Sequence, residues 1–174
     1  MFNRHGFDRV TIDQIMAEAG LTRGGFYNHF RNKEQLYAEA VASFLMGRGA
    51  IWRTEAGVEG ETPAPQIAVQ MIESYLSDRH LGDLDGQCPM IALSSDVARA
   101  HAEVGEAYQM LLDAMVGLFE QCLADRGEGA RREALSLALL CVGGMILARS
   151  LPQSALAAEI RGAAQEEALR RLKG

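Results

Sequence analysis

The chain has 174 residues, enough for one large domain or for a small domain joined to a larger one. Hydrophobic residues make up 48% of it, which excludes an intrinsically disordered chain. Aromatic residues are only 6%, strong helix formers abound, and runs rich in β-branched residues are missing. The composition therefore predicts an all-α protein.

The formal net charge of −6 argues at first against nucleic-acid binding, because contacts with phosphate need Lys and Arg. The charge is unevenly distributed, however: residues 1–48 carry +1 and the remainder carries −7. We therefore expect any contact with a polyanion in the N-terminal quarter of the chain.

Capping signals indicate a helix close to the N-terminus. Thr11 followed by Gln14 has the pattern of a capping box, which predicts a helix over residues 12–18. Gly20 is expected to end that helix, since glycine readily adopts the left-handed conformation of a helix C-terminus.

Two more helices follow. Thr22 is a suitable N-cap for a short helix over residues 23–29. Asn32 with Gln35 repeats the capping-box pattern and predicts a long amphipathic helix from residue 32 to about residue 46.

Residues 47–65, where Gly60 and other glycines and prolines interrupt a charged stretch, indicate a domain junction or an exposed loop. Apolar spacing then predicts five further helices. They cover residues 65–77, 89–100, 103–125, 133–151 and 155–172, with residues 78–87 as a loop. The helix over 133–151 is apolar nearly all round, so we expect a second subunit to cover part of it.

The two short helices joined by residues 19–22 have the length and turn chemistry of a helix-turn-helix. In such a unit the first helix braces the second, which enters the major groove of DNA. This pattern alone leaves two interpretations open, a DNA-binding unit or an ordinary helical hairpin.

A wider set of residues resembles the N-terminal signature of the tetracycline-repressor (TetR) family of transcriptional regulators. The matching residues are Gly6, Phe7, Thr11, Ile12, Ile15, Ala19, Gly20, Leu21, Thr22, Gly25, Phe26, Tyr27, His29, Phe30, Lys33 and Leu36. The resemblance covers residues 1 to about 45. It implies a DNA-binding domain over residues 1–46 and a helical ligand-binding and dimerisation domain over 47–174. It also implies a complete helix before Gly6, of which the sequence holds residues 1–5.

The residue types of the second short helix suit DNA recognition. Arg23 can reach O6 and N7 of guanine from the start of the helix, and Asn28 is the amide best suited to a base edge. Gly24 and Gly25 would let the helix backbone approach the duplex closely. The residues expected at phosphates are Thr11, Thr22, Tyr27, His29 and Lys33.

Methionines on the C-terminal helices suit an adaptable apolar cavity, although ordinary core packing is the alternative for each of them. The residues that we expect at a ligand site are Tyr75, Met90, Met115 and Phe119. An apolar or amphipathic effector is therefore predicted. Cys88-Pro89 is similar to a Gly-Cys-Pro helix start of some family members, with Gln87 in place of Gly, and Cys88 is a weak candidate for redox sensing.

Three cysteines, Cys88, Cys122 and Cys141, have neither CxxC pairing nor the spacing of metal ligands. We interpret them as buried thiols of a protein in a reducing compartment. The longest apolar stretch, residues 137–148, is too short to span a bilayer, and we find no signal peptide. The sequence thus predicts a cytoplasmic protein without a membrane segment, a metal site or a cofactor.

Catalytic motifs such as GxSxG, HExxH, a P-loop or GxGxxG are missing, and the four histidines are scattered. The sequence therefore predicts a regulator and not an enzyme. Its expected partners are double-stranded operator DNA, a small-molecule effector and a second copy of the chain. The alternative is a helical small-molecule-binding or interaction module that does not bind DNA.

The expected homodimer uses a four-helix bundle built from the last two helices of each subunit. The residues expected at this interface are Leu135, Leu139, Val142, Gly143 and Ile146. Gly143 and Gly144 are expected to let the partner helices approach closely.

Overall fold

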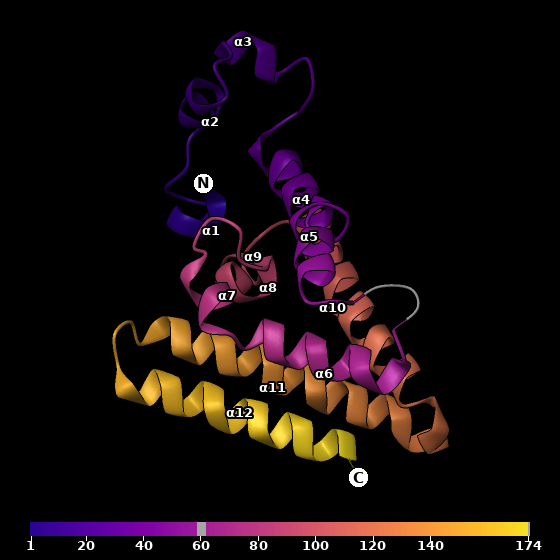
Figure 1. Cartoon of the computed structure of the whole chain (residues 1–174). Coiled ribbons are helices and arrows are strands. Elements are labelled where there is room, and N and C mark those ends of the chain that lie inside the picture. The colour runs from indigo at the N-terminus through magenta and orange to yellow at the C-terminus, as the bar shows by residue number, and fades with distance from the viewer. Residues whose placement is uncertain (59–61, 174) are drawn as a thin grey trace.

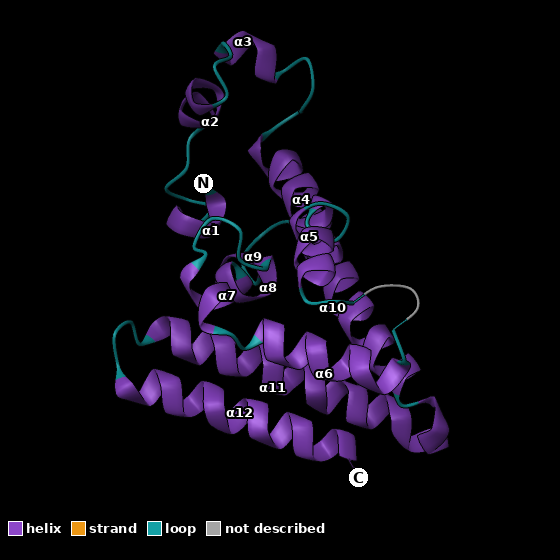
Figure 2. Ribbon diagram, in the orientation of Figure 1, coloured by secondary structure: helices purple, strands orange, loops and turns teal. Residues whose placement is uncertain are grey.

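The computed structural model describes residues 1–58 and 62–173 (Figures 1 and 2). Within these ranges all regular structure is helical and no strand is found. The prediction of an all-α fold is confirmed. Part of the predicted junction, including Gly60, lies outside the described residues.

The chain begins with three short helices, α1 (Phe2–His5), α2 (Ile12–Glu18) and α3 (Arg23–Phe26). The predicted capping box is present: the Thr11 hydroxyl accepts from the Gln14 amide at 3.2 Å, and the Gln14 side chain accepts from the Thr11 amide at 2.9 Å. Gly20, with a φ of 68°, follows α2 as expected.

The third of these helices is shorter than predicted, because α3 ends at Phe26 and the chain continues in turns to His29. Thr22 occupies the N-cap position with extended backbone, but its side chain makes no capping hydrogen bond. Two adjacent glycines in a four-residue helix, each costing about 1 kcal/mol in helix propensity, explain why regular structure stops early.

Helix α4 (Lys33–Ser43) begins at the predicted N-cap, where the Asn32 side chain accepts from the Gln35 amide at 2.8 Å. Its buried face, with Tyr37 and Val41 at 0% and 1% exposure, packs along α10 (Ala102–Cys122). This helix therefore joins the N-terminal helices to the main helical body, as Figure 1 shows.

Two segments expected as loops contain helices, so these predictions were wrong. Helix α5 (Arg48–Glu55) lies in the predicted junction and buries Trp52, and α7 (Asp78–Gly82) buries His80. Both are short and rich in polar residues, and their helical state depends on packing a single aromatic ring into the body. Regular spacing of apolar residues along the sequence cannot reveal a short helix that is held by one buried ring.

The remaining helices follow the predicted order with small shifts of their ends. They are α6 (Ala64–Tyr75), α8 (Pro89–Ala92), α9 (Ser94–Val97), α10, the 3-10 helix η1 (Ala124–Gly129), α11 (Ala130–Ser150) and α12 (Ala155–Lys173). The single helix predicted over residues 89–100 is broken at Leu93, whose ψ of 8° lies outside the helical range.

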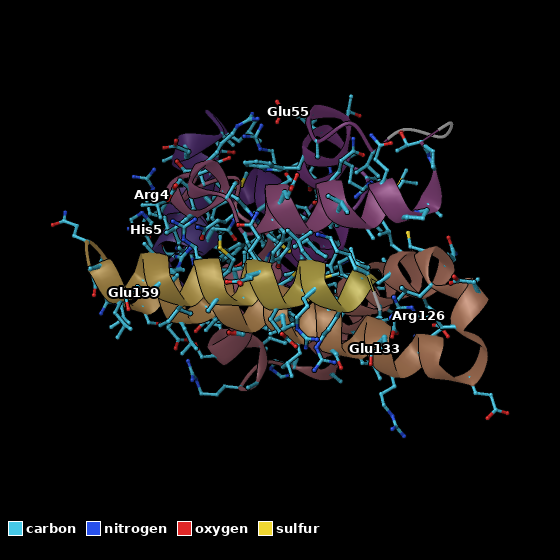
Figure 3. The ribbon with its side chains drawn as sticks, turned by 60° about the horizontal axis from the view of Figure 1, so that its bottom comes forward. Arg4, His5, Glu55, Arg126, Glu133 and Glu159 are labelled. Carbon is cyan, nitrogen blue, oxygen red and sulfur yellow. The ribbon has the colours of Figure 1, made fainter. Side chains whose placement is uncertain are left out.

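The long helices α11 and α12 run side by side at the end of the molecule opposite α2 and α3, and α6 runs alongside them in contact with α12 (Figure 1). Figure 3, seen from that end, shows Glu159 and Glu133, which lie near the starts of α12 and α11, at opposite ends of the pair. The two helices are therefore antiparallel.

One helical stretch, Ala124–Ser150, is long and apolar enough to cross a membrane by length and composition, with a mean hydropathy of 1.5. This is weak evidence for a span, because core helices of soluble proteins pass the same test. Only 39% of its apolar window is buried. A large part of the apolar surface of α11 is thus uncovered within one subunit.

The two glycines of α11 have different surroundings. A Cβ atom on Gly144 would lie 2.8 Å from Cβ of Ala164 on α12 and 3.3 Å from Cδ2 of Leu76, whereas a Cβ on Gly143 would meet nothing within 4 Å. Gly144 therefore allows close packing inside one subunit. The expectation that both glycines serve a partner helix is corrected for Gly144, and Gly143 alone is free to do so.

We expect the change Gly144→Ala to lower the free energy of unfolding by about 1–3 kcal/mol, because the added methyl group overpacks the contact between α11 and α12. The measurement is urea denaturation at fixed protein concentration. Gly117→Ala on α10 is the matched control, since its Cβ would meet nothing within 4 Å. The control should gain up to about 1 kcal/mol from helix propensity, and equal behaviour of the two variants would contradict the packing argument.

Candidate DNA-binding surface and ligand cavity

The residues proposed to read DNA lie together at one end of the molecule. Helix α3 is at the tip farthest from α11 and α12 (Figure 1), and Arg23, Tyr27, Asn28 and His29 on and after it are all exposed. Tyr27 is 56% exposed although it is aromatic. An exposed tyrosine beside an arginine and an amide has the composition of a surface that binds a polar partner.

The fold itself does not require the two glycines of α3. A Cβ on Gly24 would meet nothing within 4 Å, and one on Gly25 would make only ordinary contacts of 3.7 and 3.8 Å with Met16 and Thr22. Neither glycine has a positive φ. The two glycines lower helix propensity, and no contact within the subunit requires them. This favours the close approach of an outside partner to the helix.

The Arg23 guanidinium is paired with Asp13 of α2, with Nη1 2.9 Å from Oδ2. Both side chains are about 60% exposed, at 63% and 60%. Exposed ion pairs contribute at most about 1 kcal/mol, so a guanine or a phosphate can take the guanidinium from Asp13.

Lys33 makes contacts within the fold that were not predicted from the sequence. Its ammonium donates to the carbonyl oxygens of Phe7 at 2.9 Å and Val10 at 3.0 Å, and it lies 3.9 Å from the centroid of the Phe7 ring. These bonds fasten the segment between α1 and α2 to the start of α4. Lysine has three N–H donors, so one remains for a phosphate. The phosphate contact of Lys33 stays a prediction.

Between α4, α5, α6 and α10 lies a cavity of about 180 Å³. Its walls are mostly apolar, and two of the lining residues, Phe44 and Leu45, directly follow the C-terminal end of α4. The lining residues are Phe44, Leu45, Gly49, Trp52, Arg53, Met71, Ser74, Tyr75, His80, Cys88, Met90, Leu111, Ala114, Met115 and Leu118.

Three of the four residues expected at the ligand site, Tyr75, Met90 and Met115, line this cavity. Phe119 does not: it is 0% exposed in the core and is not among the residues that line the cavity. The placement of Phe119 at the cavity is therefore corrected. Sequence spacing could not separate Phe119 from Met115, because both belong to the same broad apolar stripe.

His80 is a cavity residue that the sequence analysis missed. Its Nδ1 lies 2.8 Å from the carbonyl oxygen of Tyr75, and its Nε2 lies 3.2 Å from the amide nitrogen of Cys88. The ring must therefore be neutral, with Nδ1 as the donor and Nε2 as the acceptor. Burial lowers the pKa of His80, which favours the same neutral form.

A buried polar connection joins the cavity wall to α1. The Gln87 side chain donates to the carbonyl of His80 at 3.0 Å and accepts from the guanidinium of Arg149. Arg149 also donates to the carbonyl of Asn3 at 2.6 Å, and the Asn3 amide donates to the carbonyl of Gln87 at 2.7 Å. Gln87, which differs from the glycine that the resemblance implies, is thus the centre of a contact between the cavity and α1.

The surroundings of the three cysteines favour a packing role over a reactive thiol. Cys88 and Cys141 are buried as predicted, whereas Cys122 is half-buried. Burial raises the pKa of Cys88 to about 11, so its thiolate is scarce at neutral pH. This gives no support to redox sensing by Cys88. Among the described residues no group of three or more His, Cys, Asp or Glu could hold a metal ion.

Fold and surface together define a helix-turn-helix regulator with a helical cavity domain. The sequence model of the bacterial regulatory proteins of the tetR family matches residues 1–40. A crystal structure of a TetR-family transcriptional regulator from Streptomyces coelicolor superposes with a TM-score of 0.75 at 25% identity, covering 99% of this chain and 90% of that chain. In its N-terminal sequence and in its fold the chain is thus similar to TetR-family transcriptional regulators. This family is not one of enzymes, in agreement with the prediction.

Other similarities point the same way. The HTH-type transcriptional regulator YerO of Bacillus subtilis is 23% identical over 145 residues, which cover 82% of this chain and 49% of YerO. The TetC protein of transposon Tn10 from Escherichia coli is 47% identical over 80 residues, 46% of this chain and 41% of TetC. The chain thus spans about half the length of these curated relatives or less.

The reduced form of NemR from Escherichia coli has a similar fold. Its crystal structure superposes with a TM-score of 0.78 at 17% identity, over 97% of this chain and 89% of that chain. The similarity thus extends through the helical body and is not confined to the N-terminal helices.

Proposed function

We propose that this protein is a cytoplasmic transcriptional repressor that binds operator DNA as a homodimer and is released by a small apolar or amphipathic molecule. The observation that carries the proposal is the exposed α3, whose arginine and unexplained glycines face outward beyond one end of α4, while Phe44 and Leu45 directly after the other end of α4 line a cavity. One rigid helix thereby connects a polar recognition surface to an apolar ligand site.

The proposed DNA contacts divide by chemistry. Arg23 and Asn28 read base edges in the major groove, and Gly24 and Gly25 allow close approach of the backbone. The proposed phosphate contacts are Thr11, Thr22, Tyr27, His29 and Lys33. All of these residues except Gly25 and Lys33 are exposed, which supports the assignment.

The proposed dimer uses the outward faces of α11 and α12. Leu135, Leu139 and Leu147 on α11 are 47%, 73% and 54% exposed, and Leu156 on α12 is 52% exposed. Several exposed large apolar side chains along these two helices favour a second subunit as their cover. Gly143, which has open space beside it, would allow a partner helix to approach closely.

The proposed release from DNA depends on the distance between the two recognition helices of the dimer. The two recognition helices of a dimer must lie about 34–36 Å apart to enter successive major grooves. Phe44 and Leu45, which directly follow α4, line the cavity, so an occupant can push the C-terminal end of α4 and swing α3. A coupling free energy of about 1–3 kcal/mol corresponds to roughly 5–150-fold weaker DNA binding.

We expect Arg23→Ala to weaken specific operator binding by about 1–3 kcal/mol and to relax base preference, because a bidentate contact with guanine is lost. The measurement is an electrophoretic mobility shift on promoter DNA of the gene itself and on random duplex. Asp13→Ala is the control: it removes the partner of Arg23 in the free protein and leaves the guanidinium in place.

Equal losses of Arg23→Ala on specific and random DNA would show that Arg23 reads phosphate only. No shift with any promoter fragment by the unchanged protein would favour the alternative, a helical small-molecule-binding or interaction module without DNA binding. The release step is tested separately, by titrating operator DNA in the presence of compounds that stabilise the protein in a thermal-shift screen.

A further inference from the structure

Two buried polar atoms of cavity residues have no hydrogen-bond partner. They are Nε1 of Trp52 and the hydroxyl of Tyr75, in residues only 8% and 5% exposed. The thiol of Cys88 lies beside the Tyr75 hydroxyl, but a thiol is a weak partner. Buried donors without acceptors are rare in folded proteins, and a bound molecule that carries an acceptor can satisfy them. Both groups carry a proton that they can donate.

The two other nitrogen-bearing side chains at the cavity, His80 and Arg53, already make hydrogen bonds to the backbone. Both ring nitrogens of His80 are bonded to the backbone, and burial lowers the pKa of this ring so that it is neutral. Arg53, the one charged residue among the described lining residues, is half-buried and donates to the carbonyl of Leu45 at 2.7 Å. No carboxylate is found among the described lining residues. A cation would therefore lose its hydration without gaining a counter-charge.

The remaining walls are apolar and adaptable. Met71, Met90 and Met115 supply thioether groups, which make favourable contacts with aromatic rings. Burial also raises the pKa of Tyr75 well above its usual value, so its hydroxyl stays protonated and can donate. The cavity thus combines soft apolar walls with two donors.

We propose that the cavity selects neutral, mainly apolar aromatic molecules that carry a hydrogen-bond acceptor such as a ketone oxygen, which accepts from Trp52 or Tyr75. This inference rests on the proposed function only in taking the cavity to be the effector site. It names the chemical class of ligand and the two residues that recognise it.

Three naphthalenes of nearly equal size test the proposal: 2-acetylnaphthalene is neutral with an acceptor, 2-ethylnaphthalene lacks the acceptor, and 2-naphthoate is an anion. Dissociation constants are measured by isothermal titration calorimetry on the full chain without DNA. We expect the ketone to bind about tenfold more tightly than the hydrocarbon, because it satisfies a buried donor. We expect it to bind more tightly than the naphthoate as well, because the carboxylate would lose its hydration among mainly apolar walls.

Single substitutions test which side chains donate to the ketone oxygen. Tyr75→Phe and Trp52→Phe should each reduce the preference for the ketone over the hydrocarbon several-fold, on the order of the loss of one buried hydrogen bond. Tyr37→Phe is the matched control, because its hydroxyl is also buried and unpartnered but does not line this cavity. Thermal melts check that all three variants are folded. The two Tyr→Phe changes remove only an unpartnered hydroxyl, whereas Trp52→Phe also removes part of a ring that contacts Arg79.

The outcomes are distinct. Tightest binding of 2-naphthoate, equal binding of ketone and hydrocarbon, or no binding of all three would each overturn the inference. A ketone preference that Tyr75→Phe and Trp52→Phe leave unchanged would overturn the assignment of the donors. If the ketone binds as expected but does not change operator affinity in a separate titration, the inferred ligand class stands and the proposed release mechanism fails.

Discussion

Leu139→Arg is expected to convert the proposed homodimer into monomers. Leu139 is 73% exposed on α11, more than either of its apolar neighbours Leu135 and Leu147 on the same helix. At a two-fold interface each substitution buries two guanidinium groups, one from each subunit, without a counter-charge. We expect the dimer dissociation constant to rise at least about 100-fold, as measured by analytical ultracentrifugation at micromolar concentration.

Met110→Arg is the matched control for this prediction. Met110 is an exposed apolar residue, at 53%, but it lies on α10 and outside the face formed by α11 and α12. The control should stay dimeric. If unchanged protein is a monodisperse monomer, or if both variants remain dimers, the proposed interface is incorrect.

Most of the fold could be predicted from local signals, because the signals were physical and short in range. The Thr11 and Asn32 caps appear where sequence placed them, since a side-chain oxygen three residues before an amide needs no tertiary contact. The long helices were found because their apolar spacing persists over several turns. Helices α5 and α7 were missed because each depends on one buried ring.

The two candidate sites also differ in how far they could be predicted from the sequence. Exposure of Arg23 and its neighbours follows from the helix-turn-helix pattern, so the recognition surface could be anticipated. The network through His80, Gln87 and Arg149 could not, because Gln87 and Arg149 are 62 positions apart and meet only through the packing of α7 and α11. The one sequence signal for this network was Gln87, which stands where the family resemblance implies a glycine.

Lys33→Met is expected to lower the free energy of unfolding by about 2–4 kcal/mol. The ammonium makes two charge-assisted hydrogen bonds, to the carbonyls of Phe7 and Val10, and each such bond contributes about 1.5–3 kcal/mol when partly buried. Methionine keeps most of the aliphatic stem, so the loss reports the charge and its bonds. The measurement is urea denaturation, followed by operator titration at several salt concentrations.

The structural and phosphate roles of Lys33 predict different results. If the ammonium mainly fastens the segment before α2 to α4, stability falls and operator affinity falls with it, because α2 and α3 lose their fixed position. If Lys33 mainly contacts phosphate, stability is unchanged and the salt slope decreases by about one. Arg31→Met, a change at an exposed cation two residues earlier whose side chain is 73% exposed, should alter stability by less than about 1 kcal/mol. A loss for Arg31→Met as large as that for Lys33→Met would show that removing any positive charge from this segment destabilises it, and would contradict a specific brace at Lys33.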